Sequence, residues 1–333
     1  MFNMILIGAG AMGRVHAEAY SQMDHVNIVG IVDPQIENAR KLAELLNCKV
    51  FASYDEAIPF LEEVDVIDIC LPTHLHKEFV QRSADSGKHV ICEKPLAGNL
   101  QDAKQMIEYC DNKGVRLFVG HVIRFFPEYQ HAKQMIDSGK AGEVKLARTS
   151  RGGKFPDGWN NWFGNLEKSG GLILDMIIHD FDFLRWCFGE VERVYAKSAS
   201  HQGDPNLQYA LVTLRFQSGV IAHVEGSWAH EGFSMKFELS GTTGVIDYDS
   251  AKEQPIVYLR RAKSTNVPGA ADPVSILTKN PYYSELQHFL SCIEGNQQSI
   301  VTAYDAYKAM EISLAAIESI RTKEPVILTN AKF

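Results

Sequence analysis

The turn Gly8-Ala9-Gly10-Ala11-Met12-Gly13 has the spacing G-x-G-x-x-G, which suits the binding of a phosphate group. In such a turn the first glycine permits a tight bend, the second lets the backbone approach a pyrophosphate, and the third lets helix and strand pack closely. The helix that follows would direct unpaired N–H groups toward the phosphates. The residues predicted to form this dinucleotide site are Gly8, Gly10, Ala11, Met12 and Gly13.

Asp33 indicates which dinucleotide the turn would bind. It lies at the end of the next β-rich run, where a carboxylate can accept hydrogen bonds from the adenosine ribose hydroxyls. The alternative is that Asp33-Pro34 only opens a turn or caps the next helix. A carboxylate here would repel a 2′-phosphate, and Pro34-Gln35 supplies no arginine or lysine to compensate. We therefore predict NAD as the cofactor, in preference to NADP.

A second turn, Leu71 to His76, follows the next strongly apolar run, and in an open α/β sheet it would lie at the edge where ligands bind. We expect Pro72, Thr73 and His76 to contact the cofactor. His74 and His76 could be mistaken for metal ligands. They have no third ligand at suitable spacing, so we predict that the protein holds no metal.

Glu93-Lys94-Pro95 ends another predicted strand, on the same edge of the sheet. We expect Glu93 and Lys94 beside the nicotinamide. There the Lys94 ammonium could hold a substrate oxygen and lower the pKa of its hydroxyl. The alternative is a surface lysine that pairs with Glu93, and spacing alone leaves the two interpretations equal.

Asp175 and His179 are four residues apart, so they would share one face of a predicted helix over 171–188 that is otherwise apolar. Ionisable groups on an apolar helix need partners or a cavity. With an ordinary pKa near about 6.5, His179 is suited to take the proton of an alcohol as its hydride leaves. Asp175 could orient the histidine ring or hold a neighbouring hydroxyl. For an isolated pair, a core histidine bonded to Asp175 is the simpler alternative.

Two kinds of architecture would position these groups. Strand-like and helix-like segments alternate through residue 120, which predicts a parallel sheet covered on both faces. From Val191 to Leu259 strand follows strand across short turns, which predicts a mostly antiparallel sheet. The strands expected there are Val194–Ser198, Tyr209–Phe216, Val220–Trp228, Met235–Leu239, Val245–Tyr248 and Ile256–Leu259. Helices are expected at 171–188, 283–294 and 303–322, with a long surface loop at 266–273.

Composition limits the possible partners and the compartment. The chain has 333 residues and a formal net charge of −8, so it has no general attraction for nucleic acid or anionic membranes. It has no apolar run near the length of about 18 residues that a membrane span needs, and no visible signal peptide. Its six cysteines include no C-x-x-C pair. We therefore predict a cytoplasmic protein that binds neither nucleic acid nor membranes.

Together these motifs resemble the Gfo/Idh/MocA oxidoreductase family along the whole chain. The most specific elements are Glu93-Lys94-Pro95 and Gly170-Gly171 followed by Asp175 and His179-Asp180. The resemblance implies an α/β chain with two domains: a Rossmann doubly wound domain at 1–121 and an α+β domain at 122–333 with an open, mostly antiparallel sheet. It also implies a homodimer or homotetramer formed through that sheet.

The resemblance also implies a function. It makes the protein an NAD-dependent dehydrogenase acting on a hydroxyl of a sugar, polyol or cyclitol. Residue by residue, Lys94 would lie beside nicotinamide and substrate, Asp175 would bind the substrate, and His179 would be the catalytic histidine. The further residues assigned to the substrate pocket are Arg124, Trp162 and Tyr282.

Several alternatives stay open. Tyr283 could replace Tyr282, and Trp162 could anchor its loop rather than stack on a sugar. The run 121–127 departs from the cyclitol enzymes, so myo-inositol itself is not assigned as substrate. The same fold could also hold NAD through a redox-neutral sugar reaction, such as glycoside cleavage or dismutation between two sugars. A non-catalytic NAD sensor is the remaining alternative.

Overall fold

The computed structural model describes residues 1–156, 158–201, 204–252, 258–261 and 280–329. The chain forms two compact units. The first comprises residues 1–122, 158–169 and 279–307, and the second comprises 123–157, 170–278 and 308–333. The chain thus returns twice to the first unit after residue 122. One cause is apolar packing, since the ring of Phe289 stacks on that of Phe118 at 5.0 Å between centroids.

The first unit contains a six-stranded parallel sheet in the order β3-β2-β1-β4-β5-β6. Its strands are β1 (Phe2–Ile7), β2 (Val26–Val32), β3 (Lys49–Phe51), β4 (Val66–Ile69), β5 (His89–Glu93) and β6 (Leu117–Gly120). This is the strand order of doubly wound dinucleotide-binding folds, so the predicted Rossmann domain is confirmed. The order reverses direction between β1 and β4, and the ligand crevice of such folds lies outside the carboxyl ends of those strands.

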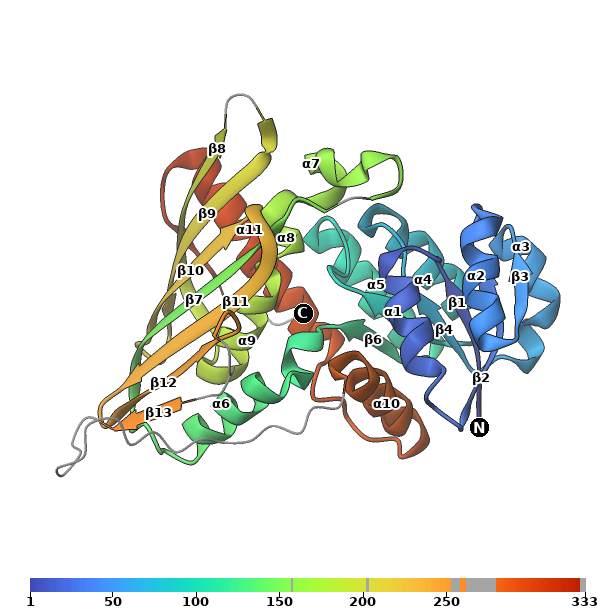
Figure 1. Ribbon diagram of the computed structural model, residues 1–333, viewed down its shortest axis with the longest axis horizontal. Coiled ribbons are helices and arrows are strands. Elements are labelled where there is room, and N and C mark those ends of the chain that lie inside the picture. Colours follow the sequence, from blue (N-terminus) through green and yellow to red (C-terminus); the bar gives the residue numbers. More distant parts are fainter. Residues whose placement is uncertain (157, 202–203, 253–257, 262–279, 330–333) are drawn as a thin grey trace. The chain divides into compact units, whose positions relative to one another are not determined.

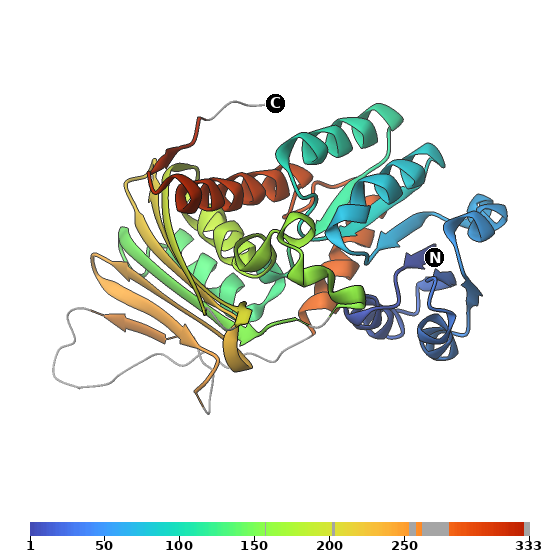
Figure 2. The same cartoon turned by 90° about the horizontal axis from the view of Figure 1, so that it is seen from above.

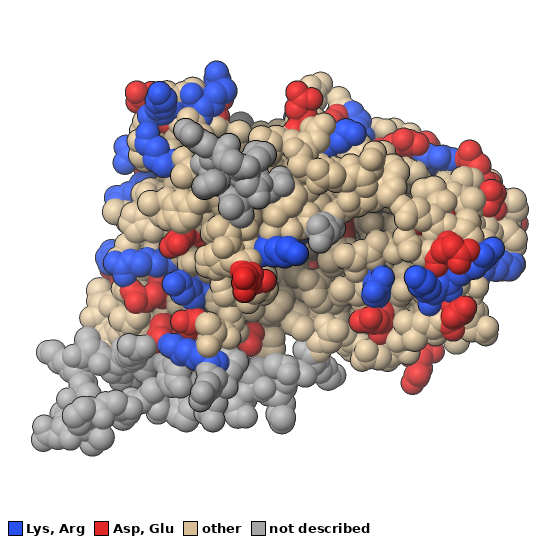
Figure 3. All heavy atoms as spheres, turned by 45° about the horizontal axis from the view of Figure 1, so that its top comes forward, with Lys and Arg blue, Asp and Glu red and all other residues tan. Residues whose placement is uncertain are grey.

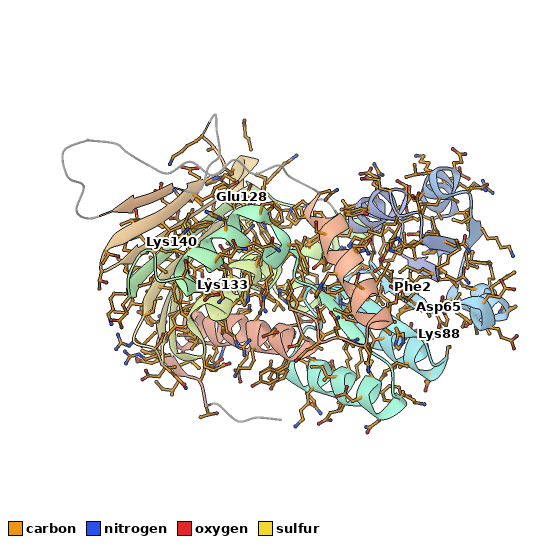
Figure 4. All side chains as sticks on the ribbon, turned by 90° about the horizontal axis from the view of Figure 1, so that it is seen from below. Phe2, Asp65, Lys88, Glu128, Lys133 and Lys140 are labelled. Atoms are coloured by element: carbon orange, nitrogen blue, oxygen red, sulfur yellow. The ribbon has the colours of Figure 1, made fainter. Side chains whose placement is uncertain are left out.

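Helices cover both faces of this sheet. They are α1 (Ala11–Tyr20), α2 (Ile36–Leu46), α3 (Tyr54–Ala57), α4 (His76–Asp85), α5 (Leu100–Lys113) and α10 (Pro281–Glu294). The same unit contains α7 (Leu166–Ser169), which packs against residues 73–75 after β4. Helix α1 packs against α2 and α10, and α4 packs against α5. Phe2, Asp65 and Lys88, labelled in Figure 4, mark the amino ends of β1, β4 and β5. The glycine turn lies at the opposite edge, because the three strands are parallel.

The second unit contains an eight-stranded sheet in the order β13-β12-β11-β7-β10-β9-β8-β14. Its strands are β7 (Val144–Lys154), β8 (Val191–His201), β9 (Asp204–Phe216), β10 (Ile221–Ser227), β11 (Ala229–Gly241), β12 (Gly244–Asp249), β13 (Tyr258–Arg261) and β14 (Val326–Ile327). Strands β7 and β10 run parallel, and the other described pairs are antiparallel. The expected open, mostly antiparallel sheet is therefore confirmed.

One face of this sheet carries the core of the second unit. The helices α6 (Pro127–Asp137), α9 (Ile178–Phe188) and α11 (Ala303–Thr322) lie together on it (Figures 1 and 2). Side chains alternate along the strands: Val212 and Val224 are buried, whereas Leu211 and Ile221 are about two-fifths exposed on the opposite face. This alternation is typical of a sheet with one packed and one open face.

One expectation needs correction, and two others fall outside the described residues. The helix expected over 171–188 is two helices, α8 (Gly171–Asp175) and α9. The N–H groups of Met176 and Ile177 both point to the Leu172 carbonyl, at 3.0 and 3.2 Å, which interrupts the regular helical ladder. The loop expected at 266–273, and the start of the strand expected at 256–259, fall outside the described residues.

Two whole-chain features concern possible partners. Among the described helices, none combines the length and the apolar character that a membrane crossing requires. On the face drawn in Figure 3, basic and acidic side chains are intermixed rather than gathered by sign.

Candidate active site

The glycine turn joins β1 to α1 with backbone contacts that only glycine allows. Gly8 has φ +100°, and a Cβ there would lie 2.3 Å from the Cys70 carbonyl oxygen. A Cβ on Gly13 would lie 1.9 Å from the Gly8 carbonyl oxygen. Around Gly10, which caps α1, a Cβ would meet nothing within 4 Å. The turn therefore packs tightly on its protein side and is open at Gly10, where a pyrophosphate would meet the start of α1.

Asp33 is held next to this turn by two backbone hydrogen bonds. Its Oδ2 accepts from the Ala9 N–H at 2.7 Å and its Oδ1 from the Gln35 N–H at 2.7 Å. Each carboxylate oxygen can accept more than one hydrogen bond, so both retain capacity for ribose hydroxyls. The residues at the end of β2 therefore fit the adenosine end of NAD.

The turn after β4 is braced from inside by His76. Its ring is buried, with Nε2 2.8 Å from the Leu71 carbonyl oxygen and Nδ1 2.9 Å from that of Pro95. Burial lowers the pKa of His76. The ring thus connects the turns after β4 and β5, while Thr73 is buried in the first of them. Direct contacts of Pro72, Thr73 and His76 with the cofactor stay a prediction.

Glu93 and Lys94 begin the turn after β5. Glu93 is buried, and its Oε2 accepts a hydrogen bond from the Lys94 backbone N–H at 2.9 Å. Its Oε1 lies 3.1 Å from Nε2 of His16 on α1. The carboxylate is therefore directed into the protein rather than toward the surface. Sequence reasoning missed His16, although its position on the buried side of α1 with Gly13, Ala17 and Tyr20 was a usable signal.

In the second unit, Asp175 ends α8 and His179 lies in the first turn of α9, both half-buried. They do not share the face of one regular helix, because the ladder breaks between them. Two buried ion pairs hold the start of α9. Arg151 Nε donates to Asp180 at 2.7 Å, and Arg124 donates to Asp182 at 2.8 and 2.6 Å. These pairs fix the segment that presents His179.

The other predicted substrate residues divide between the units. Arg124 is buried against Asp182, so the structure gives it a role in holding α9, and substrate contact stays a prediction. Trp162 belongs to the first unit, where its ring lies 3.9 Å from that of Phe163 and 6.3 Å from that of His74. Tyr282 is in α10 of the same unit, with its ring 6.4 Å from that of His16.

Comparisons with known proteins agree with this organisation. Residues 2–121 match the model of the Gfo/Idh/MocA oxidoreductase family, described as an NAD-binding Rossmann fold, and residues 129–247 match a C-terminal domain of the same family. The chain is 31% identical to a myo-inositol 2-dehydrogenase of Thermotoga maritima, over 97% of each protein. It is also 31% identical to a 2,7-anhydro-N-acetylneuraminate hydratase of Escherichia coli, over 75% of this chain and 68% of that one.

A solved structure adds a likeness of fold. The crystal structure of a myo-inositol dehydrogenase from Corynebacterium glutamicum is 26% identical to this chain and superposes with a TM-score of 0.82. The match covers 99% of this chain and 100% of that one.

Proposed function

Because this chain belongs to the Gfo/Idh/MocA oxidoreductase family and carries its NAD-binding Rossmann domain, we propose that it is a dehydrogenase of sugars, polyols or cyclitols. The reaction would be reversible oxidation of a secondary hydroxyl. The observation that carries the proposal is the glycine turn with Asp33 hydrogen-bonded to it, on the same sheet edge as Glu93 and Lys94. Myo-inositol 2-dehydrogenase among the relatives supports this substrate class.

The chain's own residues then have distinct roles. The Lys94 ammonium holds the substrate oxygen and stabilises the charge that develops on it. His179 accepts the hydroxyl proton, and Asp175 holds the substrate beside the histidine. Bound NAD supplies the hydride acceptor. The glycine turn and the start of α1 would hold its pyrophosphate, and Asp33 its adenosine ribose.

The test is a panel of polyols, aldoses and cyclitols with NAD, followed by NADH absorbance. At least one compound is expected to be oxidised. His179→Ala should then lower kcat about 100- to 10,000-fold, which is the usual contribution of a general base. His131→Ala, on α6 of the same unit, is the matched control and should leave kcat nearly unchanged. Full turnover in His179→Ala would contradict the role of this histidine.

The hydratase relative favours one second candidate. By its name it adds water, a reaction with no net oxidation. The same residues could serve a redox-neutral sugar reaction in which NAD is reduced and reoxidised within one cycle. Substrate consumption without NADH release would support this candidate, whereas stoichiometric NADH would exclude it.

We also propose that the protein forms a homodimer or homotetramer. Copies would associate through the open face of the second unit's sheet, where Tyr209, Leu211 and Ile221 are about two-fifths exposed.

The protein's compartment is proposed from its cysteines. All six are free, as is usual in the reducing cytoplasm, so we propose a cytoplasmic location.

A further inference from the structure

A buried polar network lies behind the turn that carries Lys94. At its centre is His16, which is fully buried on α1. Its Nδ1 lies 2.8 Å from Oδ2 of Asp68 on β4, and its Nε2 lies 3.1 Å from Oε1 of Glu93 at the end of β5. The Tyr20 hydroxyl donates to the same Asp68 oxygen at 2.7 Å. One ring thus connects a helix to two neighbouring strands.

The partners of His16 determine its charge. Both ring nitrogens face carboxylate oxygens, so both are expected to donate, which only the imidazolium can do. Burial by itself lowers the pKa of His16, but the charge and hydrogen bond of Asp68, with the nearby Cys70 thiol, raise it well above its ordinary value. The pKa of Glu93 falls, although burial opposes the fall, because His16 and Lys94 stabilise its carboxylate. The charged ring therefore lies between two buried carboxyl groups, Asp68 on one side and Glu93 on the other.

Other titratable groups also surround the ring. The Cys70 thiol lies 3.3 Å from Nδ1, and burial raises the pKa of this thiol to about 12. Helix α10 brings the Tyr282 ring to 6.4 Å from the His16 ring. Glu285 of the same helix is fully buried. Burial and Asp68 raise the pKa of Tyr20, and the charge of Glu285 adds to that rise. Among the described residues, Asp68 and Glu93 supply the carboxyl oxygens that contact the ring nitrogens directly.

The network continues from Glu93 to the next residue of the chain, Lys94, through one hydrogen bond. Glu93 uses its second oxygen to accept the backbone N–H of Lys94 at 2.9 Å. A Cβ on Gly120 of the next strand would lie 3.0 Å from Glu93 Oε1, so the carboxylate packs in space that a glycine at this position leaves open. His16 itself lies on α1, the helix whose first turn begins at the glycine motif. The phosphate-binding helix and the Lys94 turn are thereby joined through one ion pair.

We propose that His16 is a positioning residue for Lys94: its ring orients Glu93, and Glu93 fixes the Lys94 backbone relative to α1. The inference rests on the proposed role of Lys94 in holding the substrate oxygen. A misplacement of about 1 Å at a reacting centre can cost about 100-fold in rate, so a remote brace of this kind would act on kcat. A merely structural histidine would instead affect stability and cofactor binding.

The first experiment compares His16→Gln, Glu93→Gln and the double variant, with Tyr20→Phe as the control. Tyr20→Phe removes one hydrogen bond to Asp68 but leaves the contact between His16 and Glu93. We expect His16→Gln to lower kcat about 10- to 100-fold, with the Kd for NADH changed less than about threefold. Tyr20→Phe should change both by less than about threefold. The kcat of the double variant should be no lower than that of the less active single variant, because both substitutions break the same contact between His16 and Glu93.

Two outcomes would overturn the proposal. One is an unchanged kcat in His16→Gln at saturating cofactor, with the effect confined to the Kd for NADH. The other is multiplication of the two single effects in the double variant. Both are measured by fluorescence titration of NADH and by steady-state rates at saturating cofactor.

A second measurement needs no turnover and so separates this inference from the proposed function. The rate at which an N-hydroxysuccinimide ester acetylates Lys94, measured by mass spectrometry, depends on the accessibility and environment of the Lys94 amine. His16→Gln should change this rate at least about threefold, while exposed Lys41 on α2 reacts as before. An unchanged Lys94 rate would overturn the proposal even if no polyol substrate is found.

Discussion

Asp33 is the residue on which the choice between NAD and NADP depends. Its carboxylate is oriented by two backbone N–H groups, so it can meet ribose hydroxyls without first being ordered. Asp33→Ala should raise the Kd for NAD about 10- to 100-fold, since a hydrogen bond to a charged group contributes about 1.5–3 kcal/mol. The Kd for NADP should change little. Equal losses for both cofactors, measured by calorimetry, would show that Asp33 does not select the ribose.

The raised pKa of His16 should make the free energy of unfolding depend on pH. Because the pKa of the folded form lies above the unfolded value of about 6.5, its contribution is complete below that pH and declines as pH rises through the folded pKa. Relative to His16→Gln, the wild-type free energy of unfolding should fall by at most about 1.4 kcal/mol per pH unit above pH 6.5. Urea unfolding between pH 6 and pH 8.5 measures it. Parallel curves for the two proteins would argue against the imidazolium.

Single residues were predictable where a motif acts through the backbone. Gly8 and Gly13 could be assigned because few other residues permit their turn. His16 and Asp68 could not be paired, because their contact joins positions 52 residues apart. A carboxylate inside the apolar run Val66–Ile69 was a visible sign that some buried partner exists.

At the scale of elements, the alternation of apolar runs predicted the parallel sheet, and α11 has the predicted bounds. Strand β7 was missed, although it is central to the second sheet. Its sequence carries lysines, arginines and glycines, which is typical of a surface loop. One of these arginines, Arg151, is instead buried because Asp180 of α9 neutralises it. Tertiary pairing of this kind is invisible to periodicity.

The contribution of the buried Arg124–Asp182 ion pair to the stability of the protein can be tested directly. Arg124→Leu should destabilise the protein by about 3–5 kcal/mol, because it leaves a buried carboxylate without its cation. The double variant Arg124→Leu, Asp182→Leu should recover most of that loss of stability. The control is Arg148→Ala, which breaks the exposed pair with Glu238 and should lower the stability by less than about 1 kcal/mol. Urea unfolding measures all three. If the double variant also keeps its substrate KM, Arg124 serves α9 alone, and a raised KM would instead support the predicted substrate contact.

The whole molecule is expected to be an oligomer, because the open face of the second unit's sheet exposes apolar side chains across adjacent strands. Leu211 stands opposite Glu225 in the antiparallel β9–β10 pair. Leu211→Arg would therefore place a charge in the patch while Glu225 supplies a cross-strand partner, so the unit itself should stay folded. Light scattering should give the wild type a multiple of 37.2 kDa and the variant a smaller mass. Glu37→Arg on α2 is the control and should leave the mass unchanged, and a monomeric wild type would refute the expectation.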